Sequence, residues 1–185
     1  MRKADSVNAD WIRSILDMYE GPLVRYAAGI VGDIERARDV VQDTFLRLCR
    51  EKDLRGIVNH LAPWLFTVCR NRAFDIRRKE QRMQSMNEDE PTVQLPQRSS
   101  FGAPERLERE EALGQVLKIL GTLPERQQDV IRLKFQHELS YKEISRITGL
   151  TVTNVGFLIH TGLKTIREDM KSESSAEQRC FRRIK

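Results

Sequence analysis

A basic amphipathic segment over residues 62–82 sets the strongest limit on how this chain can fold. Its apolar residues recur at intervals of three and four, as on one face of an α-helix: Leu65, Val68, Cys69, Ala73 and Ile76. Pro63 suits the first turn, where a backbone N–H is not needed. Six of the other positions carry arginine or lysine, against only Asp75 and Glu80, with aromatic residues near the start. One face must therefore enter a core, and the cationic face is either a solvated surface or a contact surface for phosphates and unpaired bases.

Helical periodicity continues on both sides of this segment, so the 185-residue chain is predicted to be all-α, with two small helical domains joined by a flexible linker. The first domain covers residues 8–82. We expect Asn8 or Asp10 to cap its first helix and Gly21-Pro22 to break or kink it. A strongly amphipathic helix follows over 34–50, and 51–61 is predicted to be a loop before the basic helix.

Residues 83–105 lose this periodicity and are rich in proline, polar residues and acidic residues, which predicts the flexible linker. The second domain, 106–171, contains two expected capping boxes, Thr122 with Glu125 and Ser140 with Glu143. A short helix, a turn at Gly149 and a longer helix starting at Thr151 form the pattern of a helix-turn-helix. Residues 172–185 are predicted to be a basic tail.

The sequence lacks the features that are typical of several functional classes. The three cysteines and three histidines are far apart, which argues against a disulfide framework, a zinc site or any other metal site. No glycine-rich phosphate loop or nucleophile elbow is present, so we expect no catalytic residues, no cofactor and no enzyme activity. No apolar stretch suits a signal peptide or a membrane span, and a cytoplasmic protein without membrane insertion is expected.

Four motifs in a fixed order resemble the extracytoplasmic-function class of bacterial sigma-70 factors. They are D-V-V-Q-D-T-F-L-R-L (39–48), A-P-W-L-F-T-V-C-R-N-R-A-F-D-I-R-R (62–78), L-P-E-R-Q-Q-D-V-I-R-L-K-F (123–135) and L-S-Y-K-E-I-S-R-I-T-G-L (139–150). The resemblance covers the chain from about Tyr19 to Met170. It implies a sigma-2-like helical bundle and a sigma-4-like helix-turn-helix, with core RNA polymerase and promoter DNA as partners. An anti-sigma factor is a further partner that the resemblance implies.

The resemblance also implies functions for individual residues. Those expected to dock on the polymerase are Asp39, Gln42, Asp43 and Leu46, which fits an exposed acidic face, while Phe45 is expected in the core. Those expected at the minus-10 element, where DNA is melted and a flipped base captured, are Asn59, His60, Trp64, Arg70, Asn71, Arg77 and Arg78. Asn71 has an equal alternative as a structural hydrogen-bonding residue within the bundle.

The last helix is expected to read the minus-35 element, and here the sequence departs from the family. Gly156, Phe157 and Leu158 stand where charged or polar residues are usual, so this stretch either reads DNA or docks a protein. The two glycines inside this helix, Gly156 and Gly162, allow close approach either to DNA or to another helix. The residues expected to contact bases or phosphates are Lys142, Arg146, Thr153, Asn154, His160, Thr161 and Lys164.

Two other functional classes remain open from the residues alone. One is a stand-alone helix-turn-helix regulator whose first domain senses a signal or oligomerises, which would bind operator DNA without polymerase. The other is an interaction-only adaptor, which would not contact DNA through its basic helix.

Overall fold

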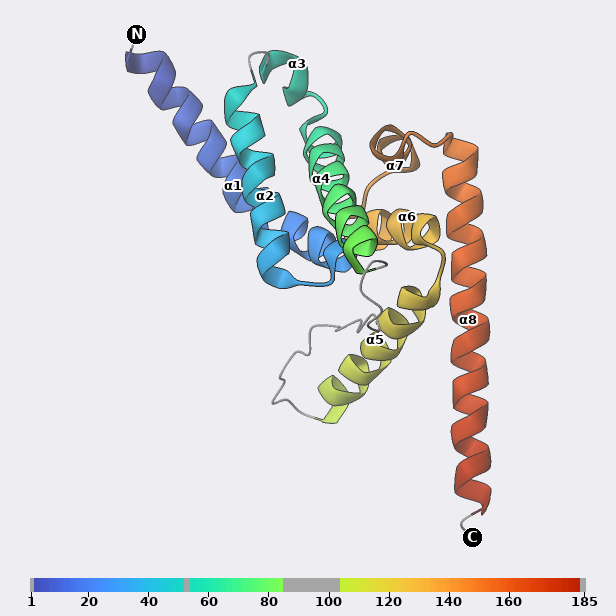
Figure 1. The fold of residues 1–185 in the computed structure, drawn as a ribbon. Helices are drawn as coiled ribbons and strands as arrows, with labels where there is room; N and C mark the ends of the chain where they lie inside the picture. Colours follow the sequence, from blue (N-terminus) through green and yellow to red (C-terminus); the bar gives the residue numbers. More distant parts are fainter. Residues whose placement is uncertain (1, 52–53, 85–103, 184–185) are drawn as a thin grey trace. The chain divides into compact units, whose positions relative to one another are not determined.

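The computed structural model describes residues 2–51, 54–84 and 104–183, and Figure 1 shows them almost entirely as helices. The helices are α1 (Arg2–Val31), α2 (Ile34–Arg50), α3 (Leu54–Val58), α4 (Leu61–Gln84), α5 (Pro104–Thr122), α6 (Glu125–Phe135), α7 (Tyr141–Thr148) and α8 (Val152–Arg183). The chain divides into two compact units, of which α1–α4 form the first and most of α5–α8 the second. The predicted all-α, two-domain fold is confirmed. Most of the predicted linker, residues 85–103, lies outside the described residues.

The first unit is a bundle in which α1, α2 and α4 pack pairwise and α3 connects α2 to α4 (Figure 1). Its largest fully buried side chains come from all three long helices: Leu23, Tyr26, Val40, Leu48 and Leu65. The rings of Tyr26 and Phe66 meet edge to face with their centroids 5.3 Å apart, a favoured aromatic geometry. The apolar stripes read from the sequence therefore face one shared core.

The start of the chain differs from the prediction. Helix α1 begins at Arg2, so Asn8 and Asp10 do not cap it, and it continues without a break through Pro22 until Gly32 at φ 76°. A proline removes one backbone hydrogen bond, whereas the following turns bury Leu23, Tyr26 and Ala27 completely. Packing of those turns outweighs the local cost. The predicted loop at 51–61 also contains a short helix, α3.

Cys69 lies in the middle of this core, fully buried on α4. Its Sγ is 3.9 Å from the carbonyl oxygen of Leu23, and Thr44 is a second neighbour. Burial raises the pKa of the Cys69 thiol from 9.0 to about 12, with the Thr44 hydrogen bond acting in the opposite direction. The thiol therefore stays protonated and unreactive while the unit is folded.

This buried thiol predicts a loss of stability in alkali. Above pH 9 the unfolded chain releases the Cys69 proton, whereas the folded chain keeps it until about pH 12. The folded state therefore loses up to about 1.4 kcal/mol per pH unit within that window, and nothing below it. Denaturant titrations of the wild type and of Cys69→Ala at several pH values measure the effect. We expect the stability difference between them to shrink as the pH rises, and a constant difference would contradict the assignment.

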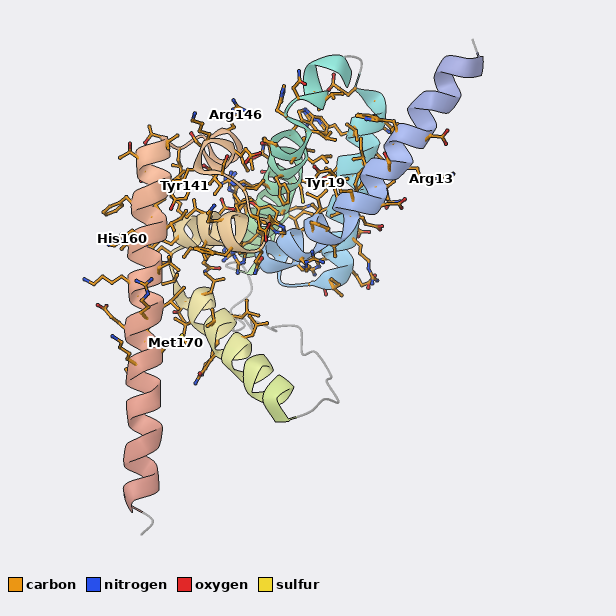
Figure 2. The ribbon with its side chains drawn as sticks, turned by 180° about the vertical axis from the view of Figure 1, so that it is seen from behind. Arg13, Tyr19, Tyr141, Arg146, His160 and Met170 are labelled. Atoms are coloured by element: carbon orange, nitrogen blue, oxygen red, sulfur yellow. The ribbon has the colours of Figure 1, made fainter. Side chains whose placement is uncertain are left out.

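The second unit is built around a cluster from α5, the α5–α6 connection, α6 and α8: Ile119, Leu120, Leu123, Ile131 and Ile166. Leu117 and Met170 pack against it, and Met170 is labelled in Figure 2 near the middle of α8. Helix α8 continues through Arg183, so the backbone of most of the predicted basic tail is helical.

The two expected capping boxes have different outcomes. Ser140 and Glu143 are confirmed, because the Glu143 carboxylate accepts from the Ser140 N–H at 2.8 Å and the Ser140 hydroxyl accepts from the Glu143 N–H at 3.3 Å. The box at Thr122 and Glu125 is wrong, since Thr122 ends α5 and its hydroxyl donates to the carbonyl of Ile119. The buried Gln128 amide instead donates to the carbonyls of Gly121 and Leu123, at 3.0 and 2.8 Å. These bonds satisfy acceptors at the end of α5.

Gly162 permits close packing of α8 against α6. A Cβ at this buried position would lie 2.6 Å from Cδ1 of Ile131 and 3.4 Å from Cδ1 of Leu123. Of the two alternatives for this glycine, close approach to another helix is the one the structure shows.

This contact predicts opposite effects of two glycine substitutions. Gly162→Val overpacks the interface and is expected to lower the free energy of unfolding by about 1–3 kcal/mol. The matched change Gly114→Ala, in α5 with open space around the new Cβ, is expected to raise it by up to about 1 kcal/mol. Urea unfolding followed by circular dichroism measures both. Similar losses from the two variants would contradict the packing explanation.

Candidate nucleic-acid interface

The first candidate surface is the outer face of α2, defined by Asp39, Gln42, Asp43 and Leu46. All four side chains are exposed, Leu46 to 45%, although leucine is usually buried. The opposite side of the helix supplies the core, including Phe45 at 6% exposure, so the prediction that Phe45 is a core residue is confirmed. An exposed leucine surrounded by acids and an amide suits a partner that offers both apolar and basic groups.

Two ion pairs join this helix to α4. The Arg72 Nε lies 2.9 Å from an Asp43 carboxylate oxygen, and Arg36 pairs with Glu80. All four side chains are partly exposed, so solvent screening makes each pair's contribution to stability small. Sequence reasoning missed these pairs, because 29 residues separate Asp43 from Arg72 and no local pattern connects them.

The second candidate surface begins where α3 turns into α4. The His60 N–H donates to the carbonyl of Ile57 at 2.8 Å, and the Trp64 N–H donates to the carbonyl of His60 at 3.0 Å. His60 therefore already follows the hydrogen-bonding register of α4. Asn59 and His60 are exposed, and Trp64 is half-buried one turn further on.

Four of the predicted minus-10 residues form one row along α4, which we call the α4 row: His60, Trp64, Asn71 and Arg78. Their spacings of four, seven and seven residues place them on one side of a helix. The opposite side is fully buried through Leu65, Cys69 and Ala73. The row runs for about 27 Å at the helical rise per residue.

Two further arginines, Arg70 and Arg77, lie beside the α4 row. Arg70 is half-buried and its guanidinium lies 4.8 Å from the centre of the Phe74 ring, a cation–π contact that holds the side chain in place. Arg77 follows two turns later and is also half-buried. Asn71 is exposed, which favours contact with a partner over a hydrogen bond inside the bundle. The sequence-predicted residues on α4 thus form one continuous polar and aromatic surface.

The third candidate surface belongs to the helix-turn-helix of α7 and α8. Gly149 adopts the expected left-handed conformation at φ 73°, and the Ser145 hydroxyl closes the turn by donating to the carbonyl of Leu150 at 2.5 Å. The Thr151 hydroxyl then caps α8 by accepting from the Asn154 N–H at 3.2 Å. The turn chemistry predicted from the sequence is confirmed.

The buried side of α8 is formed by Val155, Ile159, Gly162 and Ile166. The residues on the other side, which we call the α8 outer face, are Thr153, Asn154, Phe157, His160, Thr161 and Lys164. Lys142 and Arg146 are exposed on α7, and Figure 2 labels Arg146 and His160. All predicted minus-35 residues therefore belong to α7 or to one face of α8.

The two unusual residues in the middle of this helix have different environments. Gly156 faces the ring of Tyr141, to which a Cβ would come within 3.5 Å, and the Lys134 ammonium lies 5.6 Å from that ring's centre. Phe157 is 65% exposed on the α8 outer face. Gly156 thus belongs to the packing of α7 on α8, and Phe157 belongs to the surface.

Among the residues that the structure describes, no group of three or more histidine, cysteine or acidic residues is arranged to hold a metal ion. None of the helices described is long and apolar enough to cross a membrane.

Comparison with known proteins assigns the two units. The family model Sigma-70 region 2 matches residues 15–83, and Sigma-70, region 4 matches residues 113–166. The extracytoplasmic-function (ECF) RNA polymerase sigma factor SigW of Bacillus subtilis is 28% identical over 169 residues, covering 88% of this chain and 90% of the relative. The ECF RNA polymerase sigma factor SigL of Mycobacterium tuberculosis (strain H37Rv) is 28% identical over 170 residues, covering 89% and 91%.

Solved structures show the same fold. The sigma factor RpoE of Bartonella quintana, solved with the anti-sigma factor NepR, gives a TM-score of 0.72 at 21% identity, covering 86% of this chain and 96% of the other. CnrH, solved with the cytosolic domain of CnrY, gives 0.60 at 21% identity, covering 92% and 94%. With two region matches in the expected order on two separate units, the chain belongs to the extracytoplasmic-function class of the sigma-70 family of RNA polymerase sigma factors.

Proposed function

We propose that this sigma factor divides promoter recognition between its two units. The first unit binds core RNA polymerase and opens DNA at the minus-10 element, and the second positions the complex at the minus-35 element. The observation that carries the proposal is the pair of region matches, each on the unit that presents the corresponding surface. The domain limits that we propose are 8–82, 83–105, 106–171 and 172–185.

The outer face of α2 is the proposed docking surface for polymerase. Asp39, Gln42 and Asp43 offer acceptors to basic groups of a partner helix, and the exposed Leu46 supplies apolar contact among them. Interfaces of this composition gain orientation and association rate from the charges and affinity from the buried apolar side chain.

The start of α4 and the α4 row are the proposed site of strand separation. Capture of an extruded base requires hydrogen bonds to its edge, an aromatic surface to stack on and cations for the backbone. Asn59 and His60 supply the first, Trp64 the second, and Arg70, Arg77 and Arg78 the third. The order of these groups along one helix supports their joint action on one strand.

The α8 outer face is the proposed reader of the minus-35 element, with Lys142 and Arg146 of α7 on phosphates. In a helix-turn-helix the second helix enters the major groove and its N-terminal residues contact base edges. Thr153, Asn154 and Phe157 occupy that part of α8. The function is one of binding and positioning rather than catalysis, and it places the chain in the cytoplasm with the polymerase.

We also propose regulation by an anti-sigma factor. The sigma factor RpoE of Bartonella quintana, which has the same fold, was solved in complex with the anti-sigma factor NepR, and CnrH was solved with the cytosolic domain of CnrY. A protein that covers the outer face of α2 and the α8 outer face would block both polymerase and DNA. Affinity capture from the source cells with the folded chain as bait, followed by competition with core polymerase, tests this partner.

The central test is reconstituted transcription. Purified core polymerase and fragmented genomic DNA are incubated with and without the chain, and run-off transcripts are mapped. New transcripts that share upstream sequence support the proposal. Binding of duplex DNA without polymerase, and no transcripts, would instead support a stand-alone helix-turn-helix regulator.

A further inference from the structure

Phe157 is the most exposed apolar residue of α8 for which the structure gives a side-chain burial, at 65%. It lies opposite the core side of the helix, where Val155, Ile159 and Ile166 are buried. It is the sixth residue of α8, within the part of a recognition helix that reaches base edges. A single exposed phenylalanine is not unusual in itself, so its position among neighbours decides its meaning.

Those neighbours are polar or cationic. Helical spacing places Thr153, Asn154, His160, Thr161 and Lys164 around Phe157, at three, four or seven residues' distance. The side chains of Asn154 and His160 can donate to and accept from base edges. The Lys164 ammonium lies 3.9 Å from the Glu168 carboxylate in an exposed and therefore weak ion pair, which a phosphate can replace. Phe157 is therefore an isolated apolar group at the centre of a surface that otherwise suits DNA.

In the major groove one base presents an apolar group to such a surface. Thymine carries a C5-methyl group there, whereas cytosine has only a hydrogen atom at C5 and the purines are read through their hydrogen-bonding atoms. We propose that Phe157 is a specificity-determining residue that contacts a thymine methyl group in the minus-35 element. This inference rests on the proposed function of α8 as the minus-35 reader.

The composition of the face favours DNA over a protein partner. The sign of the charge separates this face from the outer face of α2, which also has one exposed apolar residue but carries acidic groups that suit a basic protein. Binding of DNA needs cations for phosphates, which Lys142, Arg146 and Lys164 supply in the helix-turn-helix, and hydrogen-bonding groups for base edges. On the α8 outer face Phe157 is the one aromatic or aliphatic side chain, and a cation and several hydrogen-bonding groups surround it. A hydrogen-bonding surface with a single apolar residue fits the edge of a base pair better than it fits the apolar centre of a protein interface.

The experiment uses a promoter mapped by the run-off assay and the complete polymerase complex. Each thymine of the minus-35 region is replaced in turn by deoxyuridine, which lacks only the methyl group, and complex affinity is measured with the wild type and with Phe157→Ala. Burial of one methyl group is worth roughly fourfold in affinity. We expect one thymine whose demethylation costs the wild type about that factor and costs Phe157→Ala nothing.

Two further variants sharpen the test. Phe135→Ala removes the same kind of side chain from a different helix, because Phe135 is 56% exposed on α6. It should leave the sensitivity of complex affinity to the thymine methyl group unchanged. Phe157→Arg should shift preference at that base pair toward guanine, because a guanidinium binds the guanine edge with two hydrogen bonds.

The inference is overturned if no thymine shows methyl dependence, or if Phe157→Ala weakens thymine and deoxyuridine promoters by the same factor. The second result would mark Phe157 as a protein contact. If the wild type supports no promoter-specific transcription at all, the proposed function fails first and the inference falls with it, so the two failures are distinguishable.

Discussion

The variant Asp39→Lys with Leu46→Arg is expected to bind core RNA polymerase about 100-fold more weakly than the wild type. Loss of a central apolar contact commonly costs about 2 kcal/mol, and placing like charges together adds to that. Both side chains are exposed on the outer face of α2, so the first unit should stay folded. Fluorescence anisotropy with labelled chain measures the affinity, and circular dichroism checks the fold.

A matched control exists on α1. Asp17→Lys with Met18→Arg makes the same change of charge and again replaces an exposed apolar residue, since Met18 is 66% exposed. We expect it to retain nearly full affinity. Equal losses for the two double variants would mean that net charge, rather than the outer face of α2, determines docking.

The variant Asn59→Ala with His60→Ala is expected to lower open-complex formation by about 10- to 100-fold. Each lost hydrogen bond to a captured base is worth about 0.5–1.5 kcal/mol, and its loss is felt only once the strands separate. Polymerase affinity should change by less than about twofold. Permanganate reactivity of unpaired thymines measures opening, and anisotropy measures binding.

Gln81→Ala serves as the control for this pair, because Gln81 is an exposed, uncharged residue near the other end of α4. It should leave opening unchanged. A parallel loss of opening and polymerase binding in the double variant would refute the separate assignment of the two surfaces.

Much of the fold follows from patterns within single helices. The stripe of α2, the capping box at Ser140 and the turn at Gly149 each depend on residues within a few positions, so the sequence predicts them correctly. The predicted break at Gly21-Pro22 is wrong because the packing of α1 on α2 and α4, which no local pattern shows, buries the turns after the proline. The capping box at Thr122 is wrong although the residue that bonds to the end of α5 is close in sequence, since Gln128 lies only five and seven residues from its acceptors.

In the candidate site, too, some features follow from patterns within one helix and others depend on contacts between helices. The order of the α4 row follows from helical spacing once the resemblance has named its residues. The pairing of Asp43 with Arg72 and the contact of Gly162 with Ile131 depend on how separate helices meet, and no short pattern encodes that. The actions of individual residues on DNA and polymerase stay predictions.

The two-sided build of α8 has a consequence for how such proteins diverge. Residues that hold the helix in place and residues that face outward share no positions, and exposed substitutions usually change stability by less than about 0.5 kcal/mol. Exchanges at Thr153, Phe157 or His160 can therefore alter which genes are transcribed without endangering the scaffold. After gene duplication, a copy of this chain could acquire a new set of target promoters through a few single-residue steps, each of which leaves a folded protein.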